Sequence, residues 1–343
     1  MLSEREQQLL RPPADRAAYS DRTAWLMAVL SELAYEPFEP STSRLAKLTE
    51  ELAGLDDPAA IREVLDEALA TELPALTASG DGVPMDFTAK LDTLGFRLER
   101  VISRANVHAY LALREEDRMA VLAFRGTEAD YRDILTDINA RFYKKPDGAK
   151  THTGFLQAYK RVGGEVREAC GKVGEDGYRL YVTGHSLGGA LAMIATRDLA
   201  ADHLAACYTF GSPKVGNEEF GHAIKPPIYR VVNAADVVAR IPPRKTIEIL
   251  YRLLRRLRIP LLSRLLGQMR GYLHWGDMRY LSAARREDLS DVRVIPNPSG
   301  LQQLLRALRR SLDDWHAFVT DHAISRYRAK LAAYAAWRNR QPE

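Results

Sequence analysis

The spacing of apolar residues changes along the chain and divides it into regions. Between residues 14 and 35 the apolar positions recur every three or four residues, which predicts an amphipathic helix with Ser20 or Asp21 as its cap. Residues 41–78 predict one or two further helices, interrupted at Asp57-Pro58 and Pro74. We therefore expect residues 1–85 to form an N-terminal helical extension packed on the core.

After residue 90 the apolar residues alternate or run together over short segments. Three such segments predict successive strands, the third one buried: Phe96–Ser103, Val107–Leu113 and Met119–Phe124. Strands and helices then take turns, with helices at 154–173 and 190–201 and strands at Tyr178–Thr183, Cys207–Phe210 and Ile228–Val232. This alternation predicts an α/β fold with a mainly parallel central sheet flanked by helices.

The last third of the chain does not continue this alternation of strands and helices. Residues 244–270 are rich in leucine and arginine and predict a helical insertion, which Pro260 should break in two. Residues 301–316 and 321–338 predict two closing helices. We expect residues 86–343 to form one catalytic domain that carries this insertion.

A candidate nucleophile lies between a predicted strand and a predicted helix. The segment Gly184-His185-Ser186-Leu187-Gly188 has the pattern G-x-S-x-G in the strand–turn–helix context that a nucleophile elbow requires. Side chains at the two glycine positions would collide with the neighbouring strand and helix, and the helix N-terminus favours negative charge beside the serine. The alternative is a glycine-rich turn with an incidental serine. We interpret His185 as structural, because a residue adjacent to the serine on such a turn points away from it.

Five further segments in the same order resemble the fungal-type, or class 3, lipase family of the α/β-hydrolase superfamily. They span roughly residues 90–330 and comprise Phe124-Arg125-Gly126-Thr127, His152-Thr153-Gly154-Phe155, Phe210–Asn217, Arg230–Val238 with Pro242-Pro243, and Gly271-Tyr272-Leu273-His274. The resemblance implies an α/β-hydrolase fold. The first 80 residues or so and the 244–270 insertion depart from the family pattern, and the stretch after Thr127 lacks the long apolar lid helix of the secreted fungal enzymes.

A serine nucleophile needs a base, and in this fold the chain order is serine, acid, histidine. Three histidines follow the acidic segment: His274, His316 and His322. The family places its base at a position like His322, at the start of the last predicted helix and followed by a tyrosine, here Tyr327. For His316 the alternative is a partly buried residue beside Trp315, and for His274 it is a hydrogen bond near the acidic segment.

The remaining site residues follow from the same pattern. Asp236 comes shortly after a strand, at the sheet edge where α/β folds bind ligands, whereas Asp291, Asp313 and Asp314 lack that placement. The oxyanion hole requires the amide of the residue after the nucleophile, Leu187. The resemblance assigns the second donor to Thr127, whose alternative is a helix cap, and implies that Asp137 orients the Thr127 loop.

Composition narrows the remaining possibilities. A net charge of +4 in 343 residues does not favour a nucleic-acid partner. Two cysteines, Cys170 and Cys207, cannot form a disulfide framework and are expected to be buried free thiols. Metal-binding and dinucleotide-binding motifs are missing, so no cofactor is implied. The charged N-terminus without an apolar segment led us to expect a cytoplasmic protein, soluble or peripherally bound to membranes.

These observations predict a carboxylic ester hydrolase, with acylglycerols as the leading substrate class. A phospholipase or general esterase would use the same triad. A hydrolase fold without activity, acting as a membrane-associated interaction module, is an alternative of another class. Residues 244–270 are typical of an element that contacts an anionic membrane or lipid surface; the alternative is a helical cap packed on the active site with its arginines facing water.

Overall fold

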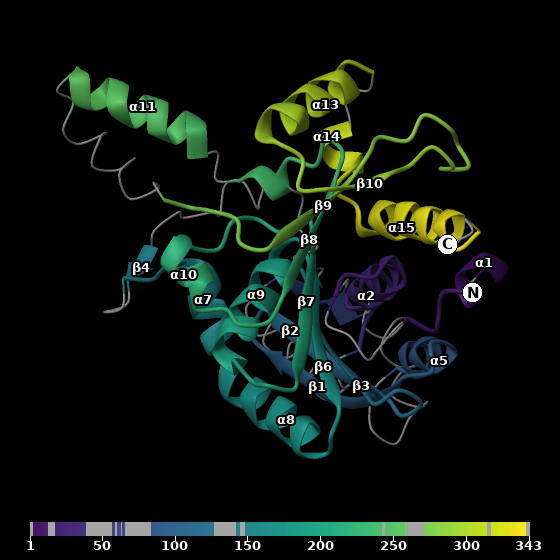
Figure 1. Ribbon diagram of the computed structural model, residues 1–343. Coiled ribbons are helices and arrows are strands. Elements are labelled where there is room, and N and C mark those ends of the chain that lie inside the picture. Colours follow the sequence, from purple (N-terminus) through teal and green to yellow (C-terminus); the bar gives the residue numbers. More distant parts are fainter. Residues whose placement is uncertain are drawn as a thin grey trace.

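The computed structural model describes residues 3–12, 18–38, 57–58, 60–62, 64–65, 84–126, 142–144, 148–241, 244–257, 259, 271–313 and 317–340. Its centre is an eight-stranded sheet with the strand order β1-β2-β3-β6-β7-β8-β9-β10 (Figure 1). Strands β3, β6, β7, β8 and β9 are mutually parallel, while β1, β2 and β10 run antiparallel to their neighbours. The predicted mainly parallel sheet is therefore confirmed.

The six strands predicted from the sequence are present with small shifts at their ends. They are β1 (Arg97–Arg104), β2 (Val107–Arg114), β3 (Met119–Phe124), β6 (Arg179–His185), β7 (Leu204–Phe210) and β8 (Ile228–Asn233). All six residues of β3 are buried, as expected for a central strand. A separate two-stranded ribbon joins β4 (Phe142–Lys144) and β5 (Lys150–His152).

Besides the β4–β5 ribbon, two strands of the main sheet were not predicted. They are β9 (Asp277–Leu281) and β10 (Val294–Pro296), which complete one edge of the sheet. Each is short, and β9 carries charged residues between its apolar ones, so neither gives a clear strand pattern. Their position is fixed by tertiary pairing: β9 aligns parallel to β8, and β10 then pairs with β9.

Helices cover both faces of the sheet. One face packs against α7 (Thr153–Lys160), α8 (Gly163–Glu175), α9 (Leu187–Leu199) and α10 (Glu218–His222), and the other against α2 (Asp21–Leu33), α5 (Met85–Thr93) and α15 (Ile324–Arg338). Alternate residues of a strand enter the two cores: Tyr181 packs on the α2 side, and its neighbours Leu180 and Val182 pack on the α9 side. The single helix predicted over 154–173 is instead two, because the chain turns at Arg161 and Val162.

Helix α2 is buried on almost all of its surface, because it lies between the sheet and α15. Ser20 caps its N-terminus, as expected. The hydroxyl groups of Ser31 and of Thr183 on β6 are hydrogen-bonded at 2.9 Å. Arg338 of α15 forms an ion pair with Asp21 at 2.7 Å. The first contact attaches α2 to β6, the strand that leads to Ser186, and the second attaches α2 to α15. The boundary at residue 85 stays a prediction.

The remaining elements lie outside the two helical layers. They are α1 (Glu4–Gln7), the 3₁₀ helix η1 (Val238–Arg240), α11 (Arg244–Arg256), α13 (Gly300–Asp313) and α14 (Ala317–Thr320). Helices α11 and α13 lie beyond the end of the sheet at which β8 leads into η1 (Figure 1). Most of the predicted 41–78 helices and the Pro260 break fall outside the described residues. Among those that are described, no helix is long and apolar enough to cross a membrane.

Candidate active site

Ser186 lies at a sharp turn between the end of β6 and the start of α9. Its φ of 54° and ψ of −126° are unusual for a residue with a side chain. The flanking glycines are required by close packing: a Cβ at Gly184 would lie 2.3 Å from the carbonyl of Gly188, and one at Gly188 would lie 2.3 Å from the carbonyl oxygen of Phe124. The backbone thus adopts the strained conformation that the G-x-S-x-G pattern predicts.

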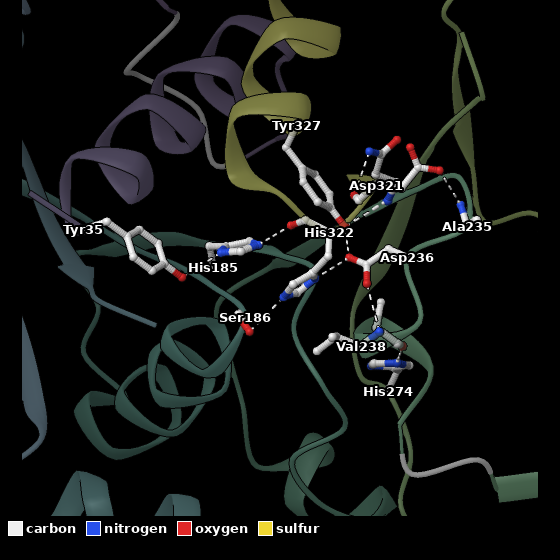
Figure 2. Close-up of polar contacts among 12 residues, drawn as sticks. Tyr35, His185, Ser186, Ala235, Asp236, Val238, His274, Asp321, His322 and Tyr327 are labelled. Carbon is white, nitrogen blue, oxygen red and sulfur yellow. Dashed lines mark hydrogen bonds and ion pairs between the residues drawn. The ribbon is translucent and has the colours of Figure 1, made fainter. Parts of the chain in front are cut away.

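In the proposed triad, His322 lies within hydrogen-bonding distance of both Ser186 and Asp236 (Figure 2). The Nε2 atom of His322 is 3.0 Å from the Oγ atom of Ser186. The Nδ1 atom of the same ring is 2.9 Å from Oδ2 of Asp236, which is fully buried. His322 belongs to the turn just before α15 rather than to its first residue, since α15 begins at Ile324. The arrangement has the connectivity needed to move a proton from a hydroxyl to an imidazole.

The carboxylate of Asp236 is held by donors on both oxygens. The backbone N–H of Val238 donates to Oδ1 at 2.9 Å, and the Tyr327 hydroxyl donates to Oδ2 at 2.5 Å. Burial, followed by the nearby Asp236 carboxylate, raises the pKa of Tyr327 well above its ordinary value, so the hydroxyl keeps its proton. The same hydroxyl accepts the backbone N–H of Asn233 at 3.0 Å. Tyr327 therefore joins the last helix to the loop that carries the acid.

His185 contacts the backbone of His322 and the side chain of Tyr35 (Figure 2). Its Nε2 lies 2.7 Å from the backbone carbonyl of His322, and its Nδ1 lies 2.8 Å from the Tyr35 hydroxyl. A carbonyl can only accept, so Nε2 carries the proton and Nδ1 accepts from Tyr35. Burial lowers the pKa of His185 well below its ordinary value, which keeps the ring neutral. His185 is structural, as predicted, but no sequence signal pointed to Tyr35.

A second set of contacts ties the His322 turn to the end of β8. The Asn233 side chain donates to the backbone carbonyl of Asp321 at 2.8 Å, and the Ala235 N–H donates to the Asp321 carboxylate at 3.1 Å. The buried Lys330 amine donates to the Asn233 side chain at 2.6 Å. Burial lowers the pKa of Lys330 to about 8, although Asp321 opposes this shift. This network fixes the two loops that carry His322 and Asp236 relative to each other.

The turn after β7 passes close to the side chains of Asp236 and His322. Gly211 has a φ of +58°, and a Cβ there would lie 2.6 Å from Oδ2 of Asp236 and 2.9 Å from Nδ1 of His322. Only glycine leaves room for that hydrogen bond. Gly211 lies in one of the segments that resemble the lipase family, and no steric role was predicted for it from the sequence.

The other candidate residues have separate outcomes. Leu187 is the first residue of α9, so its N–H has no acceptor within the helix and adjoins Ser186. Thr127, Asp137 and His316 lie outside the described residues, so the roles predicted for them stay predictions. His274 donates from Nε2 to the carbonyl of Ala239 at 2.5 Å, and burial lowers its pKa, which fits the alternative of a supporting hydrogen bond near the acidic segment.

Other expectations concern residues away from the site. Asp291 accepts the backbone N–H groups of Arg285 and Arg286 in an exposed loop, which agrees with setting it aside as the acid. Cys170 and Cys207 are buried and free, as predicted. Among the described residues, no group of three or more histidine, cysteine, aspartate or glutamate side chains could hold a metal ion.

The known proteins that are similar in sequence to this chain include lipases. The chain is 34% identical over 155 residues to a lipase of Rhizopus niveus, and the match covers 41% of this chain and 39% of that protein. It is also 34% identical over 151 residues to the secreted mono- and diacylglycerol lipase 1 of Fusarium solani, covering 41% of this chain and 44% of that protein. The chain thus spans less than half the length of these relatives.

The names of the relatives overturn one expectation. The Fusarium solani protein and a similar protein from Malassezia restricta are both named as secreted lipases. This contradicts the cytoplasmic location that we expected from the charged residues at positions 1–8. The expectation was wrong because it relied on a short stretch of local sequence, which says nothing about how related lipases are distributed.

The solved structures agree with the fold. Lipase II from Rhizopus niveus superposes with a TM-score of 0.51 at 22% identity, covering 82% of this chain and 93% of that one. Residues 121–246 match the family described as lipase (class 3), and this stretch contains Ser186 and Asp236. Residues 121–246 of this chain are therefore similar to the class 3 lipase family, and the solved structure shares the fold of the chain.

Proposed function

We propose that this protein is a serine ester hydrolase, a lipase that cleaves acylglycerols through an acyl-serine intermediate. The observation that carries the proposal is the continuous series of contacts from Ser186 Oγ to His322 Nε2 at 3.0 Å and from His322 Nδ1 to Asp236 Oδ2 at 2.9 Å. The strained backbone of Ser186 at the start of α9 supports it. The proposal takes its substrate class from the acylglycerol lipases among the relatives.

In the acylation step, His322 Nε2 accepts the proton of the Ser186 hydroxyl while Oγ attacks the ester carbonyl carbon. The carbonyl π bond opens, and the negative charge collects on its oxygen. The imidazolium then donates its proton to the alkoxide oxygen of the leaving alcohol as the C–O ester bond breaks. Asp236 stays ionised throughout and stabilises the imidazolium through its contact with Nδ1.

Deacylation repeats these steps with water. His322 accepts a proton from water, the hydroxide oxygen attacks the acyl carbon, and the proton returns to Ser186 Oγ as the carboxylic acid leaves. The oxyanion in both steps is assigned to the N–H of Leu187 and to Thr127. Removal of one such donor typically costs about 2.7–4 kcal/mol in transition-state stabilisation.

Contact with a lipid surface is assigned to the 244–270 segment, of which α11 is described. Ile249, Leu253 and Leu257 follow one another at four-residue spacing and are all exposed. Arg252, Arg255 and Arg256 are exposed on the same helix. Apolar and cationic side chains on one helix suit the boundary between acyl chains and anionic headgroups.

The triad is tested by replacing the serine. Ser186→Ala should leave less than about one thousandth of the wild-type turnover of a short soluble ester, because the three residues act as a unit. Ser103→Ala on β1 is the control and should keep full activity. Wild-type protein, but not Ser186→Ala, should be labelled by a fluorophosphonate. Labelling of both would place the nucleophile elsewhere, and labelling of neither would favour the inactive interaction module.

The substrate class and the lipid contact need separate assays. A hydrolysis profile over short esters, a triglyceride emulsion and phospholipid vesicles identifies the preferred ester. Reversing the charges of Arg252, Arg255 and Arg256 should lower binding to anionic vesicles in low salt while leaving short-ester turnover unchanged, because each arginine near an anionic surface contributes about 1 kcal/mol. Equal sedimentation of wild type and the triple variant would favour the helical cap instead.

A further inference from the structure

We infer that α13 is a second lipid-docking helix, which acts together with α11 and faces an anionic lipid surface. This inference rests on the proposed function. Helix α13 (Gly300–Asp313) has Leu301 and Leu305 on the same face, at four-residue spacing, and their exposed fractions are 65% and 57%. Exposed apolar side chains grouped on one face of a helix are typical of a surface that binds a partner.

The large exposed apolar side chains are concentrated on and just after α11 and on α13. Nine large hydrophobic side chains are exposed among the residues that the structure describes, and six of them lie on α13 or on α11 and the residues just after it. These six are Ile249, Leu253, Leu257, Ile259, Leu301 and Leu305. Scattered exposure would be ordinary for a protein surface, whereas two helices at one end of the molecule indicate a binding face.

The positive charge on α13 favours an anionic partner. The helix contains Arg306, Arg309 and Arg310 and only one acidic residue, Asp313. Arg309 follows Leu305 by four residues, so it continues the line of the two leucines, and both Arg309 and Arg306 are exposed. Leucines flanked by arginines match a lipid surface that bears anionic headgroups over apolar chains.

The position of α13 connects this face with the active site. The Arg310 guanidinium lies 3.5 Å from the carboxylate of Asp321, the residue that precedes His322. The buried Ala307 anchors the opposite side of the helix. Helix α14 (Ala317–Thr320) then leads directly into the His322 turn, and both helices lie beyond the same end of the sheet (Figure 1). A surface bound by α13 would therefore lie next to the base of the triad.

The test measures binding of the full chain to vesicles of phosphatidylcholine with and without phosphatidylglycerol. The variant Leu301→Asp/Leu305→Asp should bind anionic vesicles at least about tenfold more weakly than wild type, because it removes apolar contact and adds negative charge. Met85→Asp is the matched control: Met85 is 58% exposed but lies on α5, far from α13 in Figure 1, and should bind as wild type. The variant Arg306→Glu/Arg309→Glu should lose binding chiefly at low salt.

Two further measurements keep the inference separate from the proposed function. Turnover of a short soluble ester should be unchanged in both α13 variants, and its absence in wild type would refute the hydrolase while leaving the vesicle result to stand alone. Wild-type binding of anionic vesicles by the leucine variant would overturn the inference. So would a dimer in size-exclusion chromatography that the leucine variant dissociates, because a second copy of the chain would then be what covers the leucines.

Discussion

A single methyl group at Gly211 should disable the site while leaving the fold in place. A Cβ at this position would lie 2.6 Å from Asp236 Oδ2 and 2.9 Å from His322 Nδ1, whereas ordinary contact begins at 3.4 Å. The carboxylate and the imidazole must therefore move by about 0.8 Å and about 0.5 Å, and a 1 Å misplacement can cost about 10²-fold in rate. We expect Gly211→Ala to lower kcat by about 10- to 100-fold.

The same substitution also carries a conformational cost. Because φ at Gly211 is +58°, alanine there should lower the free energy of unfolding by roughly 1–2 kcal/mol. Gly171→Ala in α8 is the matched control, since a Cβ there would meet nothing within 4 Å and alanine favours the helix by up to about 1 kcal/mol. Steady-state turnover of a short soluble ester and denaturant unfolding measure both effects. If Gly211→Ala kept half of the wild-type kcat, the steric reasoning would be refuted.

Two further predictions concern the histidines and the buried lysine. His322→Ala should abolish turnover, because its ring is hydrogen-bonded to Ser186. His274→Ala should keep most of the turnover, because its ring is hydrogen-bonded to the backbone of the loop after Asp236. Comparable loss in both variants would contradict the choice of base. For Lys330, burial lowers the pKa from 10.5 to about 8, so between these pH values the unfolded chain binds a proton that the native protein has released. The free energy of unfolding of wild type relative to Lys330→Met should then rise with pH through this window, by up to about 3 kcal/mol. Urea unfolding of both proteins at pH 7, 9 and 10.5 measures this difference. A difference that does not change with pH would show that the native amine keeps its proton.

The sequence was most informative where local pattern and chemistry coincide. The glycines around Ser186 and the apolar strands β3 and β6 are determined by close packing within a few residues, so they could be predicted. Strands β9 and β10 could not, because they form only by pairing with β8 and with each other.

The residues that support the site also could not be predicted from the sequence. Tyr35 and Lys330 reach the triad loops through tertiary contacts with residues 150 and 97 positions away. A tyrosine after a helix and a lysine within one have no pattern that marks them as parts of a site. Their roles depend on which helices pack together, and the spacing of residues within each helix does not contain that information.

The pairing of α2 with α15 has a consequence for the order in which the candidate site assembles. Arg338 and Asp21, which join these helices, are 317 residues apart, and the turn that carries His322 immediately precedes α15. Contacts between such distant segments form late, because closing a long loop is entropically costly. During synthesis the sheet and Ser186 can assemble well before the base arrives. A ribosome-bound chain that has emerged only as far as β10 would thus lack His322 at the folded site, and the esterase activity that we propose should be gained as one of the last events of folding.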